Sequence, residues 1–261
     1  MPDLSICIPC KNRSRCAVRP EDYSCEEIDN GHKELRTIYP LPNCIRSIAL
    51  SAMPGDDWEI VIADFGSDDW PLSEWVALMA TPVPVRIVQV DEPFSAGKGL
   101  NVAAANARAD NLLFLATDML VNRAVMVEGM KRLREGLLYI PQPTIYKDPD
   151  HTKLVPGSEL SGTDFICKAM FAEVGPFPEF RSNGLGDSAW FERATIVLGP
   201  QRFLLEAHAG LFHQWHPHRP EWKNRHYPHW QEDEAKKHAA WKAGQFQEGH
   251  MEWPAQTEEA R

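Results

Sequence analysis

The chain has 261 residues, of which 43% are hydrophobic and 25% charged, the composition of a globular protein with a substantial core. Its net charge of −10 disfavours a nucleic-acid backbone as the partner, although a local basic groove is compatible with this charge. No stretch approaches the roughly 18 consecutive apolar residues that cross a bilayer. We therefore predict no membrane-spanning or signal segment.

Eight elements are predicted in the first half of the chain, as four apolar strands that are each followed by a helix. Such alternation is typical of an α/β protein with a parallel sheet covered by helices. In chain order, the strands and helices are predicted at Leu4–Ile8, Asn43–Met53, Trp58–Ala63, Pro71–Met79, Pro84–Val90, Lys98–Arg108, Asn111–Thr117 and Arg123–Arg134.

The remaining segments are less regular. Arg13–Pro42 is too long for an ordinary strand-to-helix connection, so we expect a functional loop that closes over a bound ligand. We predict one domain over residues 1–218, in two halves (about 1–122 and 123–218), and a helical extension with a polar tail over 219–261. The later elements are predicted as an irregular proline-rich stretch at Pro141–Gly162, an edge strand at Thr163–Lys168 and a helix at Gly186–Leu198.

Six cysteines are present, and five of them lie within the first 44 residues. Cys7 and Cys10 have the C-x-x-C spacing of a metal site, but they fall at the end of a strand, where alternate residues point to opposite faces. Because no second C-x-x-C follows, we favour buried or free thiols over a zinc site or disulfides. Reduced thiols favour a cytoplasmic location.

Polar side chains follow the end of each predicted strand. Ligands of open parallel sheets bind at the carboxyl ends of the strands, so these residues are candidates for one shared site. In chain order they are Pro9, Lys11, Asn12 and Arg13 after the first strand, Asp64 after the second, Lys98 and Asn101 after the third, and Asp118 after the fourth.

The motifs IPCKNR, EIVIADFGSDD and FSAGKGLNVAAANARADNLLFLATD, in this order and spacing, resemble the nucleotide-binding half of glycosyltransferase family 2. The downstream VGPFPEFRSNGLGDSAWFERA resembles the acceptor-side segment of that family and the corresponding region of β-1,4-galactosyltransferases. The resemblance implies a GT-A fold, a Rossmann-like single domain with a mostly parallel sheet and helices on both faces. It also implies a nucleotide-sugar donor, a divalent metal, a glycan or other hydroxyl-bearing acceptor, and inversion at the transferred carbon.

In the family, an aspartate in the turn after the second strand accepts a hydrogen bond from the nucleotide base, and Asp64 occupies this place. A uracil ring offers one imide N–H, which favours a UDP-linked donor. The alternative is an aspartate that only caps its own turn. The resemblance also places Pro9, Asn12, Arg13, Lys98 and Asn101 on the donor, while a plain glycine-initiated helix remains an alternative for the last two.

Asp118 is the strongest metal candidate, because the family holds a divalent cation with an Asp-x-Asp motif and this chain has Ala116-Thr117-Asp118. One carboxylate needs further ligands. The segment GLFHQWHPHR offers His213, His216 and His218, of which His213 fits best at the end of an apolar strand. This ligand set favours Mn²⁺ over Mg²⁺. Alternatively, Asp118 only caps the next helix, and the histidines pack beside Trp215.

Asp187 matches the second acid of the Glu-Asp pair that the family uses to bind acceptor and remove its proton, whereas Gly186 replaces the first acid. We predict Asp187 as the catalytic base, with a first-turn helix acid as the alternative.

Two other functions remain open. A nucleotidyltransferase normally has a glycine-rich loop after the first strand, and CKNRSRC contains no glycine. A non-catalytic nucleotide- or sugar-binding protein of the same fold is compatible with the acids missing at Ala116 and Gly186.

Overall fold

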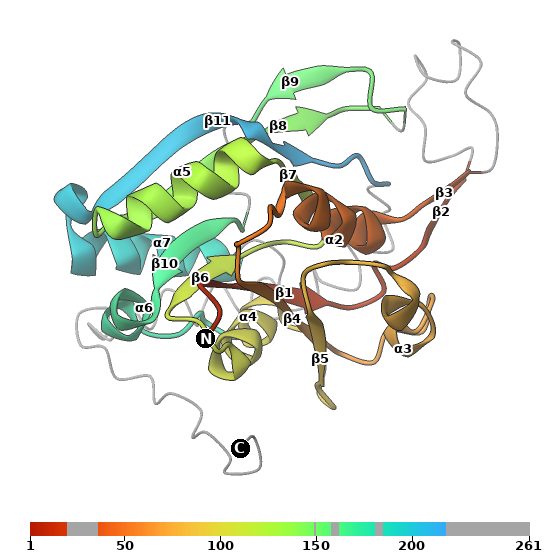
Figure 1. Cartoon of the computed structure of the whole chain (residues 1–261), viewed down its shortest axis with the longest axis horizontal. Helices are drawn as coiled ribbons and strands as arrows, with labels where there is room; N and C mark the ends of the chain where they lie inside the picture. Colours follow the sequence, from red (N-terminus) through yellow and green to blue (C-terminus); the bar gives the residue numbers. More distant parts are fainter. Residues whose placement is uncertain (20–35, 149, 158–161, 181–184, 218–261) are drawn as a thin grey trace.

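The computed structural model describes residues 1–19, 36–148, 150–157, 162–180 and 185–217. A nine-stranded mixed sheet runs through the molecule, with helices packed on both of its faces (Figure 1). The predicted extension and tail over 219–261 and the candidate ligand His218 lie outside the described residues, as does part of the long loop after the first strand.

The first half of the sheet contains the predicted parallel strands in the order β5-β4-β1-β6. All side chains of the two inner strands β1 and β4 are buried, which explains their near-continuous apolar sequences. The four strands are β1 (Leu4–Cys10), β4 (Trp58–Asp64), β5 (Val85–Gln89) and β6 (Asn111–Phe114).

The second half of the sheet is mixed and continues from β6 in the order β10-β8-β11-β7, with β9 paired to β8. β10 is antiparallel to both of its neighbours, and β7 is antiparallel to the end of β11. These strands are β7 (Met119–Val121), β8 (Leu138–Tyr146), β9 (Leu154–Pro156), β10 (Asp164–Cys167) and β11 (Phe203–His213).

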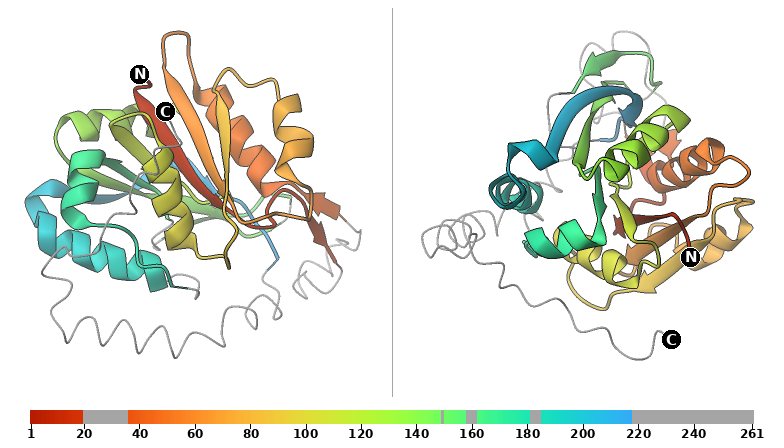
Figure 2. Two further views of the ribbon diagram at one scale, coloured as in Figure 1. Left: turned by 90° about the horizontal axis from the view of Figure 1, so that it is seen from below. Right: turned by 60° about the vertical axis from the view of Figure 1, so that its left-hand side comes forward.

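The helices divide into two groups, one on each face of the sheet, and each group buries its own apolar cluster (Figure 2). One face is covered by α2 (Pro40–Ser51), α3 (Leu72–Trp75) with the short 3-10 helix η2 (Val76–Leu78), and α5 (Arg123–Arg134). The other face is covered by α4 (Ala96–Asn106), α6 (Lys168–Val174) and α7 (Leu185–Leu198), and the 3-10 helix η3 (Pro200–Arg202) follows α7. The predicted single α/β domain with helices on both faces is confirmed.

The strand predicted at Thr163–Lys168 is present as β10, but its predicted position at the sheet edge is wrong. β10 lies between β6 and β8, with Asp164 opposite Phe114 and Phe165 opposite Tyr139. Its short length made it resemble an edge strand, whereas the sheet order is set by pairing with distant segments that sequence does not specify.

Two segments that were predicted as irregular contain strands. Pro141–Gly162 includes the end of β8 and all of β9, and these two strands pair over Thr144–Tyr146. Pro141 and Pro143 lie between Tyr139, which pairs with β10, and Thr144, where the pairing with β9 begins, so their missing N–H groups are tolerated. The long loop after β1 contains the antiparallel pair β2 (Cys16–Val18) and β3 (Arg36–Ile38), and α2 begins inside it at Pro40.

Cys7, Cys10, Cys44 and Cys167 are free thiols, and Cys7 and Cys10 belong to the apolar clusters on opposite faces of the sheet. Burial raises the pKa of Cys7 above its ordinary value and that of Cys10 to about 12. Because metals bind the thiolate, these buried thiols are poor ligands. Among the helices that the structure describes, none combines the length and hydropathy needed to span a bilayer.

Gly99 sets how closely α4 approaches the end of β1. A Cβ on Gly99 would lie 2.6 Å from the Pro9 Cβ and 3.1 Å from the Pro9 Cα. We expect Gly99→Ala to lower the free energy of unfolding by about 1–3 kcal/mol, because a rigid proline cannot yield to the added carbon. The gain in helix propensity offsets at most about 1 kcal/mol of this cost.

Urea denaturation measures this change, with Ala105→Ser as the matched control. That substitution also adds one heavy atom to α4, at a partly exposed position. Equal stabilities of wild type and Gly99→Ala would show that α4 can move away from β1.

Candidate functional site

The loops that follow β1 and β4 are locked together at the carboxyl ends of these strands. Asn12 adopts a left-handed backbone (φ 53°), and its N–H donates to Ser67 Oγ at 3.0 Å. Its side-chain Oδ1 accepts from the Asp68 N–H at 2.9 Å. Lys11 Nζ donates to the carbonyls of Phe65 and Gly66 at 3.0 and 2.6 Å. These hydrogen bonds hold the loop after β1, which contains Asn12, against the turn after β4. Both segments were predicted to bind the donor.

Asp64 is buried at the end of β4 and is already hydrogen-bonded within the protein. Its Oδ1 accepts from the Ser67 N–H at 3.1 Å and from the Ser67 hydroxyl at 2.7 Å. Its Oδ2 accepts from Gln89 Nε2 at 3.3 Å. The turn-capping alternative is thus present in the structure. The base-binding role of Asp64 stays a prediction.

The predicted donor-binding residues of α4, Lys98 and Asn101, contact other parts of the protein. Asn101 is buried and exchanges two hydrogen bonds with the Phe177 backbone, at 2.9 and 2.8 Å. Lys98 pairs with Glu92 and lies 3.8 Å from Glu179. Gly99 packs against Pro9, and a Cβ on Gly97 would lie 2.2 Å from a backbone carbonyl. The glycines thus let α4 approach protein backbone, and Asn101 ties α4 to the segment before α7.

Asp118, His213 and His216 come together where β7 pairs with the end of β11. His213 lies opposite Met119 in this antiparallel pair, and the Gln214 N–H donates to the Asp118 carbonyl at 2.8 Å. His216 Nε2 lies 3.3 Å from Asp118 Oδ2, and His213 Nε2 lies 3.9 Å from Oδ1. His213 and His216, the two candidate histidines that the structure describes, therefore both lie next to Asp118.

The charge of this cluster stabilises an ionised Asp118. Burial by itself would raise the pKa of Asp118, but the hydrogen bond from His216 and the charges of His213, His216 and Arg13 hold that pKa well below its ordinary value. Arg13, a predicted donor-binding residue after β1, thus acts on the same site. Asp118 does not cap α5, because Asn122 Oδ1 accepts from the Ala124 and Val125 N–H groups in the first turn of that helix.

The three side chains fit a divalent cation. One carboxylate oxygen and one nitrogen from each histidine lie within 4.8 Å of one another, a spread compatible with metal–ligand distances of about 2.0–2.2 Å. A carboxylate with two imidazoles suits a first-row transition metal such as Mn²⁺ better than Mg²⁺, which prefers oxygen ligands. Three protein ligands leave further positions for phosphate oxygens or water.

Asp187 lies in the first turn of α7, and the structure places a second carboxyl group beside it. Asp164, which opens β10, is 6% exposed and was not predicted as a site residue. Burial raises the pKa of Asp187 to about 6. Burial and the nearby charge of Asp187 raise the pKa of Asp164 to about 8. The sequence signal was weak, since an acid opening a presumed edge strand reads as a solvated residue.

The segment before β10 places Asp187 next to the turn that carries Asp118. A Cβ on Gly162 would lie 3.8 Å from Asp187 Oδ2 and 3.9 Å from the Ala116 Cβ. Asp187 and Ala116 therefore both lie beside Gly162. Ala116 is two residues before Asp118 in the sequence. The structure joins the predicted base and the predicted metal site into one candidate active site.

A family model described as glycosyl transferase family 2 matches residues 39–189, more than half of the chain. The chain belongs to glycosyl transferase family 2. The match begins just before α2 and ends inside α7, so it contains Asp64, Asp118 and Asp187. No curated protein matches the sequence.

Solved glycosyltransferases share the GT-A fold of this family 2 chain. TarS of S. aureus, in complex with UDP-GlcNAc, superposes with a TM-score of 0.60 at 18% identity, over 84% of this chain and 60% of TarS. A mannosyltransferase from Pyrobaculum calidifontis, in complex with GDP-Man and Mn²⁺, gives 0.57 at 14% identity, over 86% of this chain and 60% of the other. The chain thus spans less than two thirds of these two proteins.

A third similar structure is glucosyl-3-phosphoglycerate synthase from Mycobacterium tuberculosis, in complex with Mn²⁺ and UDP-glucose. It gives a TM-score of 0.54 at 14% identity, over 87% of this chain and 76% of the other. At such low identities, these likenesses show the fold and leave the chemistry to be argued from the residues of this chain.

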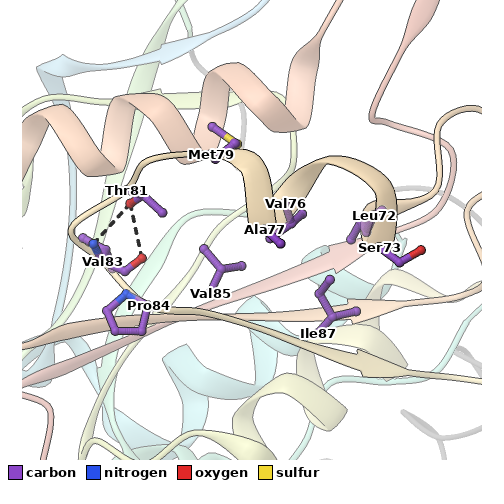
Figure 3. Close-up of a pocket in the computed structure, with 10 residues that line it drawn as sticks. All are labelled: Leu72, Ser73, Val76, Ala77, Met79, Thr81, Val83, Pro84, Val85 and Ile87. Carbon is purple, nitrogen blue, oxygen red and sulfur yellow. Dashed lines mark hydrogen bonds between the residues drawn. The ribbon is translucent and has the colours of Figure 1, made fainter.

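An apolar pocket of about 330 Å³ lies apart from the candidate site, between α3, η2 and the edge strand β5 (Figure 3). Its lining includes Leu72, Val76, Val83, Val85 and Ile87, and none of the predicted site residues. No charged side chain lines this pocket, so its lining suits an apolar group better than a diphosphate.

The buried carboxyl group of Asp164 predicts a pH-dependent stability. The pKa of Asp164 is about 8 in the folded state against 3.8 ordinarily, so the unfolded chain binds fewer protons between these values. The free energy of unfolding should fall as pH rises through this window, by up to about 1.4 kcal/mol per pH unit for one such group. Asp164→Asn should remove this contribution and stabilise the protein more at pH 7 than at pH 5.

Urea denaturation of wild type and Asp164→Asn at pH 5, 6 and 7 measures the difference directly. Parallel pH dependences of the two proteins would mean that Asp164 is ionised in the folded state throughout.

Proposed function

We propose that this protein transfers a sugar from a nucleotide-sugar, favoured as a UDP-sugar, to an acceptor hydroxyl with inversion and with a divalent metal. The observation that supports this most is the convergence of Asp118, His213 and His216 at the carboxyl end of the parallel half of the sheet. Ligands of such sheets bind at this edge. Membership of glycosyl transferase family 2 supports transfer of a glycosyl group over other reactions of a diphosphate.

The donor site is proposed along the ends of β1, β4 and β6. Pro9, Asn12 and Arg13 border it from the first strand, and Asp64 faces the base. TarS and the synthase were solved with UDP-sugars, which agrees with a uracil-binding Asp64, whereas the mannosyltransferase was solved with GDP-Man. Lys98 and Asn101 contribute less directly in this proposal, because their contacts hold α4 against neighbouring segments.

The chemistry assigns separate tasks to the two parts of the site. A divalent cation held by Asp118, His213 and His216 supplies Lewis-acid stabilisation of the departing diphosphate. Asp187 takes the proton of the acceptor hydroxyl. The acceptor oxygen forms its bond to the anomeric carbon as the bond to the diphosphate breaks on the opposite face, so the configuration inverts.

The proposed reaction also gives a role to each half of the domain. Residues 1–218 are proposed as the GT-A domain, with residues up to about 122 binding the nucleotide and the rest the acceptor. The likeness of residues 174–194 to β-1,4-galactosyltransferases stays a prediction, as does the cytoplasmic location. A nucleotidyltransferase is disfavoured, because the β1 loop is fixed by Lys11 and Asn12 side chains and contains no glycine-rich phosphate loop.

A non-catalytic nucleotide- or sugar-binding protein is the second candidate. The observation that favours it is the loss of acids at Ala116 and Gly186, positions where the family usually has them. Slow donor hydrolysis separates the two candidates, since an enzyme releases UDP from a UDP-sugar in the presence of Mn²⁺ and a binding protein does not.

Asp118→Ala should abolish the metal dependence. With Mn²⁺ at about 100 times its Kd, the wild type should be stabilised by about 2.7 kcal/mol, because the ion binds only the folded state. Asp118→Ala should lose this stabilisation and the Mn²⁺-dependent release of UDP from UDP-glucose or UDP-GlcNAc. Thermal denaturation with and without Mn²⁺, and an assay of released UDP, measure both effects.

Asp110→Ala is the matched control, since it removes an exposed carboxylate at the opposite end of β6. An Asp118→Ala protein that keeps the Mn²⁺-induced shift would show that the metal binds elsewhere or not at all.

Asp187→Asn keeps the shape of the side chain and removes its basicity. The UDP release rate should fall about a hundredfold or more, the scale of general-base removal, while the thermal shifts with Mn²⁺ and UDP remain. Glu192→Gln, which removes a charge from the same helix, should keep the rate. The first anomer released from the donor, followed by NMR, tests inversion.

A rate that is unchanged in Asp187→Asn, together with a lower melting temperature, would assign Asp187 to helix stabilisation only. Retention of the donor's configuration would reject the inverting mechanism even if the rate collapsed.

A further inference from the structure

Asp164 is a buried acid, and within the part of the chain that the structure describes no positive charge pairs with its carboxyl group. It opens a central strand and is 6% exposed, and no cation and no N–H or hydroxyl donor pairs with its carboxyl group among the described residues. Leaving a carboxyl group in such a position costs stability, as hydrophobic residues pack there at no such cost. The proposed mechanism assigns it no task, although it lies at the edge of the candidate active site.

The geometry aims Asp164 toward the proposed base. Asp164 is opposite Phe114 in the β10–β6 pair, so their side chains share the face of the sheet that α7 covers. Phe114 packs on Trp190 of α7, with ring centroids 6.4 Å apart. Asp187 lies on the same helix, less than one turn before Trp190, and its charge acts directly on Asp164. The first turn of α7 and the first residue of β10 therefore form one carboxyl pair.

We propose that Asp164 is a positioning residue for Asp187, a carboxyl group that orients the Asp187 carboxylate toward the acceptor. This inference rests on the proposed function, because it assigns Asp164 a part in that reaction. Two carboxyl groups in one apolar site do not ionise together, so the pair retains one proton near neutral pH. That proton stays on Asp164 while Asp187 receives the proton of the acceptor hydroxyl.

The other titratable groups on the elements packed against β10 have partners elsewhere. Lys168 of α6 donates to the Ala107 carbonyl, and Glu173 pairs with Arg202. Tyr139 of β8 feels the charges of α5 and β11 near its hydroxyl, not those of the carboxyl pair. On α5, the ion pairs of the described residues are Arg123–Asp56, Lys131–Glu128, Arg132–Glu128, Arg132–Glu135 and Arg132–Glu206. Asp187 is thus the charge that decides the protonation of Asp164.

A ¹³C NMR titration of carboxyl-labelled aspartate tests the pair without any assay of activity. Wild type should show an aspartate that titrates near pH 8, absent in Asp164→Asn. In Asp187→Asn the same signal should titrate at lower pH, because the neighbouring charge is gone. Absence of any aspartate titrating above pH 6, or an unchanged midpoint in Asp187→Asn, would overturn the proposal.

The rate of UDP release from UDP-glucose with Mn²⁺ tests the positioning role. Asp164→Ala should lower kcat about tenfold or more with little change in the KM for the donor, as expected when a base is misoriented. Asp164→Asn restores a hydrogen-bond donor and should recover most of the lost rate. It should also remove the alkaline fall in rate that ionisation of Asp164 causes in the wild type.

Thr163→Val is the matched control, since it changes the adjacent buried residue, whose hydroxyl has no partner in the described structure, and should keep both kcat and the pH profile. Equal losses in Asp164→Ala and Asp164→Asn, with lowered melting temperatures, would reduce Asp164 to a structural residue. Wild type that releases no UDP while its carboxyl titration is as expected would instead refute the proposed function and leave the pair established.

Discussion

The antiparallel pairing of β7 with the end of β11 is the interaction on which the candidate site depends. Through it the backbone at Asp118 receives the Gln214 N–H, and His213 comes to lie opposite Met119. The Gln214 side chain also bonds to Asn43 and to the Pro40 carbonyl, which ties this junction to α2. Residues about a hundred positions apart thus meet with their backbones fixed, and the metal ligands need little further ordering when an ion binds.

Four acids of the candidate site lie in different environments, with Asp64 and Asp118 at or after the ends of strands, Asp164 at the start of β10 and Asp187 on α7. Asp64 is stabilised by hydroxyl and N–H donors, and Asp118 by imidazoles and the charge of Arg13. Asp164 and Asp187 have neither kind of partner in the described residues, and their pKa values rise. One edge of a sheet therefore contains an anionic ligand, suited to a cation, and a more basic carboxyl pair, suited to accepting a proton.

Close backbone contacts join the two halves of the domain. Gly99 lets α4 rest on Pro9, and Asn101 binds the Phe177 backbone in the segment that leads to α7. Through these contacts of α4, the segment that precedes α7 is held against the strands of the first half of the sheet. Asn101 was predicted to bind the donor, whereas its contacts with Phe177 hold α4 against the neighbouring segment.

The amino-acid sequence by itself determined the parallel half of the sheet and the boundaries of α5, and it singled out Asp118 as a metal candidate, because apolar runs, caps and strand-end acids are local patterns. It also singled out His213 and His216 as candidates. Only the tertiary structure decided that both histidines reach Asp118, that β10 is central, and that Asp164 lies beside Asp187. These facts depend on which distant strands pair, and pairing is fixed by the packing of the whole sheet, which no local pattern records.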